Sequence, residues 1–239
     1  MKLNVSSKNR KGFSIVEVAI AMGIVTLLLT TFLGVFGPAQ NNIQRAIGAQ
    51  DISRMKDALS TEMSIYRSSE QMNYDNSFDK AFEMLKGSSD PNMAILVYQY
   101  KALLQDTDDD GILPPYTGDN GVQGRDFIIQ TAVRRLDVDS SKIEEEIAPS
   151  SIEGAVYVVA MTQLVEDNGS LNLGAAAEIV NPDGGGEAEN STDYLSAVLT
   201  FKADFYRLRV NKFEYVAGGA WDFSNIGGVL TSINMAVRR

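Results

Sequence analysis

Carboxylates at two places in the chain need a partner of opposite charge: a single Glu near the start and an Asp-rich segment in the middle. Glu17 lies just inside an apolar run that carries no other charge and continues to Gly37. A charged side chain in a bilayer core costs about 2.5 to 3.5 kcal/mol on insertion scales, so a carboxylate there indicates a function. The second group is the segment Asp106-Thr107-Asp108-Asp109-Asp110-Gly111-Ile112, whose alternating carboxylates have the spacing of a cation-binding loop.

The acidic segment matches the first seven positions of an oxygen-rich calcium loop. Alternate carboxylates can face one ion, the carbonyl of position 7 adds a ligand, and Gly111 permits a positive φ. The alternative is an acidic, solvated turn. Four Asp residues in five positions repel one another unless a cation or water screens them. We therefore predict a structural calcium ion, with its ligands drawn from Asp106, Asp108, Asp110, Ile112 and Asp119.

The segment departs from an EF-hand after its seventh position. Position 12 is Thr117 where a bidentate Glu is expected, and Pro114-Pro115 prevents a following helix from starting normally. Asp119 or Asp126 could complete the ligand shell instead. The pattern favours a short calcium turn with a weak site, of about 10⁻⁴ to 10⁻³ M, over a helix–loop–helix sensor.

The residues Arg10-Lys11-Gly12-Phe13-Ser14-Ile15-Val16-Glu17-Val18 resemble the processing site of type IV prepilins and of type II secretion pseudopilins. In that family a basic leader ends in Gly, cleavage falls between Gly and Phe, and Glu is the fifth mature residue. The resemblance implies that a prepilin peptidase cuts between Gly12 and Phe13 and methylates the new amine of Phe13. It also implies that Glu17 of one subunit meets the Phe13 amine of a neighbour and sets the register of a filament.

Charge pairing at this site also follows from the residues alone. A new amine at Phe13 and the Glu17 carboxylate would be opposite charges four residues apart, each costly in lipid unless neutralised. The pair could form within one helix or between two helices that stack with an axial offset.

Two other interpretations compete for residues 1–39. In a secretory signal peptide, cleavage after Gly37-Pro38-Ala39 would leave Gln40 as the first residue. The uncharged stretch from Val18 to Gly37 is 20 residues long, which exceeds the apolar core of about 7 to 15 residues in a signal and is enough to span a bilayer. A plain membrane anchor explains this length, but it explains neither Gly12-Phe13 nor Glu17.

Composition limits the function further. Four basic residues and no acid in residues 1–12 predict a cytoplasmic leader and an exported body in a single-pass inner-membrane protein. Without that leader, 17 basic and 31 acidic side chains remain, a balance that excludes binding to a nucleic-acid backbone. The chain has no His, which removes His-based triads and imidazole zinc sites. It also has no Cys, which departs from many adhesive pilins and favours pseudopilins.

We predict an α+β, pilin-like fold in which a long N-terminal helix, membrane-spanning in its first half, packs on a C-terminal antiparallel sheet. The expected divisions are a cleaved leader (1–12), a membrane and assembly segment (13–38), an amphipathic helical half (39–68) and a globular domain (69–239) with the acidic loop 106–119. The single long helix runs from about Ser14 to about Ser68 and is kinked or loosened around Gly34, Gly37 and Pro38. Its distal stripe consists of Ile43, Ile47, Met55, Leu59, Met63 and Tyr66.

Within the globular domain, apolar patterns predict several shorter elements. Short helices are expected around Phe78 to Gly87 and over Asp126 to Leu136, with Glu144-Glu145-Glu146 on a solvated face. The apolar segment Met93 to Leu104 fits a helix or a strand, and we favour a helix. Strands are expected over Ala155 to Val165, Leu195 to Val210 and Val229 to Val237.

The expected function is that of a structural filament subunit that binds calcium and has no catalytic role. Its partners would be a prepilin peptidase, other pilin or pseudopilin subunits and an inner-membrane assembly platform, with no nucleic acid. The globular domain would be periplasmic, or extracellular in a filament. The alternative is a membrane-anchored, calcium-dependent binding protein that never polymerises.

Overall fold

The computed structural model describes residues 14–67, 73–106, 111–167, 169–219 and 221–239, with backbone alone for residues 35–50 and for Asp183. Contacts group the chain into two units, Met1–Asp51 and Ile52–Arg239, and each is described by itself. Helix α1, Ile15–Ser64, begins in the first unit and its last turns belong to the second. The predicted long helix is confirmed, and its helical assignment continues without a break through Gly34, Gly37 and Pro38.

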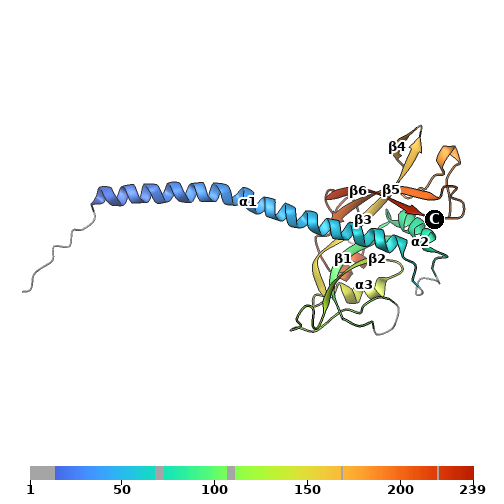
Figure 1. Ribbon diagram of the computed structural model, residues 1–239, viewed down its shortest axis with the longest axis horizontal. Coiled ribbons are helices and arrows are strands. Elements are labelled where there is room, and N and C mark those ends of the chain that lie inside the picture. Colours follow the sequence, from blue (N-terminus) through green and yellow to red (C-terminus); the bar gives the residue numbers. More distant parts are fainter. Residues whose placement is uncertain (1–13, 68–72, 107–110, 168, 220) are drawn as a thin grey trace, which may run out of the picture. The chain divides into compact units, whose positions relative to one another are not determined.

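The second unit is built on one six-stranded antiparallel sheet (Figure 1). The strand order is β2-β1-β3-β5-β6, and β4 pairs with the far end of β3. The strands are β1 (Ile95–Ala102), β2 (Ile128–Arg135), β3 (Ile152–Asp167), β4 (Ser170–Leu173), β5 (Val198–Arg207) and β6 (Thr231–Arg238), and the helices of this unit beyond α1 are α2 (Ser77–Gly87), α3 (Ser140–Glu146) and α4 (Phe213–Ala217).

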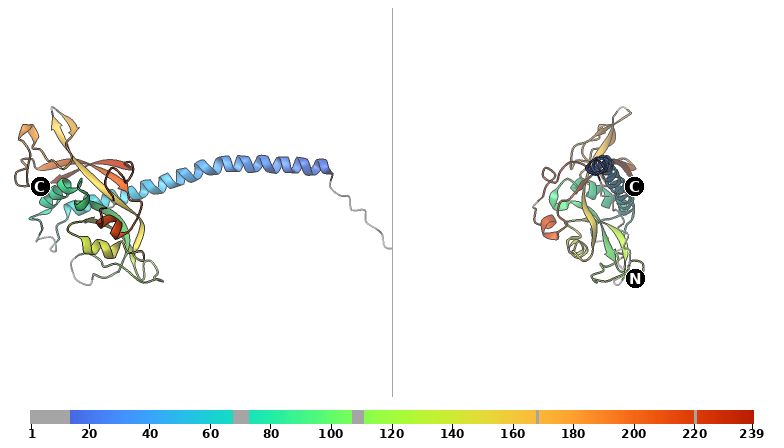
Figure 2. Two further views of the ribbon diagram at one scale, coloured as in Figure 1. Left: turned by 180° about the vertical axis from the view of Figure 1, so that it is seen from behind. Right: turned by 90° about the vertical axis from the view of Figure 1, so that its left-hand side faces the viewer.

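We call the second unit, Ile52–Arg239, the body. Helices cover both faces of its sheet, which gives the body two separate cores (Figures 1 and 2). On one face, Met55, Leu59 and Met63 from the last turns of α1 pack with α2 against β1, β3 and β5. On the other face, α3 and α4 cover the opposite sides of β1 and β3, and Trp221 lies fully buried there. Burying a large apolar side chain contributes about 1.5 to 3 kcal/mol, so Met55, Leu59 and Met63 hold the last turns of α1 to the sheet.

Helix α2 begins with a side-chain cap and ends at the predicted residue. The side chain of Asn76 accepts a hydrogen bond from the N–H of Asp79, which satisfies one of the free donors at the helix start. Phe78, Phe82 and Leu85 face the core, and the helix ends at Gly87 as expected. A Cβ at Gly87 would lie 2.6 Å from Cε of Met93, so a larger residue at this position would require the Met93 side chain to move.

Two predicted helices are wrong: Met93 to Leu104 contains β1 and Asp126 to Leu136 contains β2. The strand β1 is buried on both sides because Ile95 and Val97 face the first core whereas Leu96 and Tyr98 face the second. A strand with two apolar faces loses the alternation by which strands are recognised. The sheet therefore includes the middle of the chain, in addition to the three C-terminal strands that were predicted and are confirmed.

Candidate functional site

The start of α1 places the Glu17 carboxylate in a hydrogen bond with the backbone. The N–H of Ser14 donates to Oε2 of Glu17 at 2.9 Å, and the N–H of Val16 donates to Oγ of Ser14 at 3.3 Å. The arrangement resembles a capping box, with the difference that the Ser14 hydroxyl accepts from the N–H of Val16 in place of that of Glu17. The two side chains satisfy N–H groups that have no partner at a helix start. This cap was not among the predictions, although the Ser-x-x-Glu spacing at residues 14–17 is the signal for such a helix start.

The two residues of the predicted cleavage site, Gly12 and Phe13, lie outside the described residues. The cleavage and the pairing of a Phe13 amine with Glu17 therefore stay predictions. In the described part of the chain, Glu17 uses only its Oε2 atom for a hydrogen bond. Its second oxygen is thus available to a further donor at the helix start.

The first twenty residues of α1, Ile15–Gly34, are long and apolar enough to cross a membrane, by length and composition alone. None of this segment is buried against the rest of the chain. The hydroxyls of Thr26 and Thr31 donate to carbonyls one helical turn earlier, each at 2.8 Å. Such bonds satisfy polar side chains within the helix itself, which suits a hydrocarbon environment where water is absent.

The acidic loop is described only at its edges. Asp106 and Gly111 lie within the described residues, whereas Asp108 and Asp110 lie outside them. The N–H of Gly111 donates to Oδ2 of Asp106 at 2.9 Å, and Gly111 has φ of 79°. A positive φ is the conformation for which the sequence analysis invoked glycine at this position. Ile112 follows it, half-buried, with a carbonyl that the sequence analysis assigned as a ligand.

The two remaining carboxylates that were considered as ligands lie in different surroundings. Asp119 is exposed. Asp126 instead accepts hydrogen bonds from Arg125 and from the N–H of Val122, and these bonds lower its pKa. Within the described ranges, no three His, Cys, Asp or Glu side chains are arranged to hold a metal, a finding that does not extend to residues 107–110.

A guanidinium also approaches the acidic loop. A Cβ built on Gly111 would lie 3.6 Å from Cδ of Arg67. Arg67 bonds both oxygens of Glu62, and Oε1 of Glu62 also accepts from Nζ of Lys80 at 2.7 Å. Burial alone would raise the pKa of Glu62, but the bond from Arg67 and the charge of Lys80 lower it below its ordinary value. This cluster ties the end of α1 to α2.

A second buried ionic cluster contradicts one prediction. Glu146 was expected on a solvated face, but it is only 1% exposed, whereas Glu144 and Glu145 are exposed as predicted. Its Oε1 accepts from Nη2 of Arg134 at 2.7 Å, and its Oε2 accepts from the Tyr98 hydroxyl at 2.6 Å. The phase of α3 explains the burial, because Glu146 lies on the same side as its buried helix neighbour Ile143, three residues earlier.

The environment of this cluster fixes its charges. Burial raises the pKa of Tyr98 well above its ordinary value, and the negative charge of Glu146 adds to the shift. Burial alone would lower the pKa of Arg134, but Glu146 reverses this and the pKa lies above its ordinary value. The hydroxyl therefore stays protonated and the guanidinium stays charged, an arrangement that suits a structural link between α3 and the sheet rather than proton transfer.

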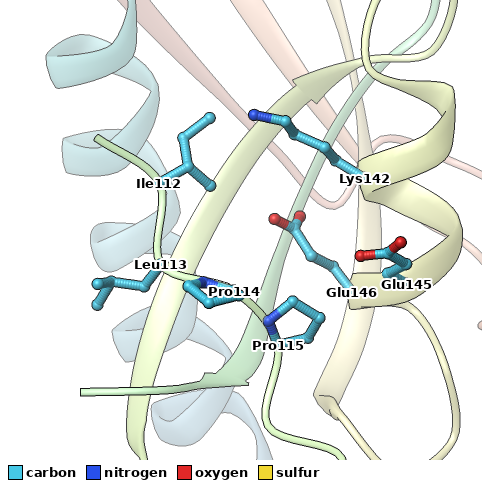
Figure 3. Close-up of a pocket in the computed structure, with 7 residues that line it drawn as sticks. All are labelled: Ile112, Leu113, Pro114, Pro115, Lys142, Glu145 and Glu146. Carbon is cyan, nitrogen blue, oxygen red and sulfur yellow. The ribbon is translucent and has the colours of Figure 1, made fainter. Parts of the chain in front are cut away.

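A small pocket lies beside this cluster (Figure 3). Figure 3 shows Lys142, Glu145 and Glu146 of α3 on one side and the chain from Ile112 to Pro115 on the other. Its volume is about 70 Å³. That is room for about two water molecules, and it is far below the roughly 300 Å³ of typical small-molecule sites. The pocket therefore does not indicate a substrate site.

Comparison with known families identifies the start of the chain. Residues 7–33 match the family model described as the prokaryotic N-terminal methylation motif. Neither the curated proteins nor the solved structures gave a match. The match covers Gly12, Phe13 and Glu17 together with nearly all of the apolar segment Ile15–Gly34.

Proposed function

Because the chain carries the prepilin signature of type IV pilins and pseudopilins, we propose that it is a minor or pseudopilin-like subunit of a type IV pilus-like or type II secretion filament. The observation that carries the proposal is the methylation motif at residues 7–33, which includes nearly all of the membrane-compatible segment at the start of α1. Subunits with this motif are cleaved by prepilin peptidase and assemble with other pilin subunits. The described body adds no constellation that would suggest catalysis, so we propose a structural role.

Processing would release the amine of Phe13 next to a carboxylate that is already held in place. Glu17 binds the N–H of Ser14 through Oε2, and its Oε1 takes part in no bond within the described helix start. A charge-assisted bond to the Phe13 amine of the same or a neighbouring chain would neutralise both groups in lipid. We propose that the leader is cytoplasmic, that the body is exported, and that an inner-membrane platform receives the subunit.

The first experiment replaces Glu17 by Ala in the full chain. The expected result is a processed, membrane-held protein that is absent from the sheared filament fraction. The matched control is Glu144→Ala, which removes an exposed carboxylate of the body and should leave assembly unchanged. Normal filaments from Glu17→Ala would refute the assembly role and favour the alternative, an anchored calcium-dependent binding protein that does not polymerise.

A second experiment identifies the mature N-terminus by sequencing and mass measurement. N-methylated Phe13 is the expected first residue. An intact start would indicate a plain anchor, and Gln40 would indicate a cleaved signal peptide.

We also propose the structural calcium ion, with ligands from Asp106, Asp108, Asp110, the carbonyl of Ile112 and Asp119. The bond from Gly111 to Asp106 and the positive φ of Gly111 support a turn of this type. The nearby Arg67 is the competing source of positive charge. If the dissociation constant is about 1 mM, then 10 mM calcium stabilises the body by about 1.4 kcal/mol.

Thermal melting with calcium and with a chelator tests the ion. For a domain of this size, that stabilisation raises Tm by about 3 to 5 °C. Asp119→Asn should remove the shift. Asp126→Asn is the control that should keep it, because Asp126 is paired with Arg125. Coincident melting curves of the unaltered protein would end the calcium proposal and leave the filament proposal untouched.

A further inference from the structure

One end of the β3–β5 ladder carries cations that have no partner. Arg207, Arg209 and Lys212 are exposed, and in the described part of the chain none of them forms an ion pair. We call these three residues the cationic end. Three cations outside any ion pair are unusual in the body, because its residues 52–239 hold 29 acidic side chains and only 16 basic ones. Most of the other described cations are bonded, for example Lys202 to Asp204.

The other end of the same ladder carries unpaired carboxylates. Glu166 lies near the end of β3, and Glu178 and Glu187 flank Val180, which exchanges two hydrogen bonds with Gln163 of β3. All three glutamates are exposed and outside the ion pairs of the described residues. We call them the acidic end. It borders a depression of about 720 Å³ that Glu166 and Val180 help to line.

The register of the strands separates the two ends. Arg207 pairs with Tyr157, whereas Phe201 pairs with Gln163, so the acidic end lies beyond Gln163 and the cationic end beyond Arg207. Six residues of strand correspond to about 20 Å, which is more than twice the Debye length of about 8 Å at physiological salt. The opposite charges therefore cannot neutralise each other within one chain.

Exposed apolar side chains accompany the charges at both ends. Leu171 and Leu173 of β4 are 59% and 57% exposed, and they pair with β3 at the acidic end. Leu230 is 51% exposed and donates its N–H to the carbonyl of Phe205, next to the cationic end. Each end thus combines a charge of one sign with apolar surface, which is the composition of a protein contact rather than of a purely solvated face.

We propose that the cationic end of one copy of this chain docks on the acidic end of the next copy. The two surfaces differ and lie at opposite ends of the sheet, so the contact is heterologous and can repeat along an open filament. Glu214 of α4 follows Lys212 closely, which limits the excess positive charge and leaves part of the contact to the apolar residues. The inference rests on the proposed function, because it supplies a contact between bodies in the filament.

Thiol crosslinking in the full chain tests this contact, since the natural sequence has no cysteine. Cells that express Arg209→Cys together with Glu187→Cys are treated with a short bis-maleimide. We expect a crosslinked dimer of the two variants, and a ladder from the chain that carries both substitutions. The control pairs Arg209→Cys with Asp57→Cys, an exposed position on α1 that belongs to neither end. A yield no higher than this control would overturn the proposal.

Charge exchange provides the second readout, with Lys212→Cys and Glu178→Cys as crosslinking reporters. Arg209→Glu and Glu187→Arg should each lower the reporter yield about five-fold or more, and the two together should restore it. If no filament formed but the crosslinks persisted, the proposed function would be wrong and the contact right. If filaments formed while the crosslinks stayed at the control level and charge exchange had no effect, the contact alone would be wrong.

Discussion

Glu146→Gln should destabilise the body strongly, although it changes few atoms. The carboxylate bonds Arg134 and Tyr98, and the side chains of Arg134 and Glu146 are only 5% and 2% exposed. At 2.7 Å and an effective dielectric constant of about 20, the gross attraction is about 6 kcal/mol. Desolvation of both ions offsets much of it, but a variant that removes one partner leaves a buried, unpaired guanidinium. The expected loss is about 3 to 5 kcal/mol.

A double variant separates the ion pair from the rest of the packing. Arg134→Met with Glu146→Leu removes both charges and keeps apolar volume in the second core. Because replacing a buried pair by apolar groups is often neutral or stabilising, the double variant should be more stable than either single variant. The coupling energy from the cycle should then exceed about 2 kcal/mol.

Trp221 provides the assay for this cycle. It is the only tryptophan, it is 1% exposed, and it lies in the same core as Tyr98. Unfolding of the detergent-solubilised full chain in urea can therefore be followed by fluorescence at neutral pH. An unfolding free energy for Glu146→Gln within about 0.5 kcal/mol of the unaltered protein would refute the reasoning, because that is the range of ordinary surface substitutions.

Three further predictions use the same assay. Leu59→Ala opens a cavity where α1 meets the sheet and should cost about 2 to 5 kcal/mol, whereas Lys56→Ala on the exposed side of α1 should cost almost nothing. Gly111→Ala should cost about 1 kcal/mol because φ is 79° there, and equal stability would contradict that backbone conformation. Because the pKa of Glu62 is lowered in the folded state, its charged form stabilises the body at pH values above the ordinary pKa of 4.5. This stabilisation is lost as the pH falls through the folded pKa. The free-energy penalty of Glu62→Gln should therefore shrink below about pH 4.5. A penalty that stayed constant with pH would contradict the bonded state of Glu62.

Sequence patterns predicted the elements that have one buried face. In α1, Met55, Leu59 and Met63 recur every four residues with polar residues between them, and all three are buried. In β5, Leu199, Phe201, Ala203 and Phe205 alternate with half-buried residues, as the sequence indicated. Such elements keep the period of their secondary structure visible because their second side meets solvent.

The same reasoning failed where both sides of an element are covered. Tyr98 and Val97 face different cores, so β1 reads as a continuous apolar run that could be a helix or a strand. Length and residue type were the better guide, since β1 has eight residues and is rich in β-branched and aromatic side chains. Glu146 was missed for a related reason, because its partner Arg134 lies on a strand that had been predicted as a helix.

Glu17 has two roles, of which only the pairing with an opposite charge was predicted from the sequence. Its position inside an apolar segment requires a partner of opposite charge, and the cap shows that the same carboxylate also organises the first turn of α1. The cap occupies one oxygen, so in the proposed assembly the helix start would be ordered before an amine from a neighbour arrives. Preorganisation of this kind lowers the entropy lost on assembly. Glu17→Gln could keep the cap through its amide oxygen while losing the charge, and it therefore separates helix initiation, which should persist, from filament assembly, which should fail.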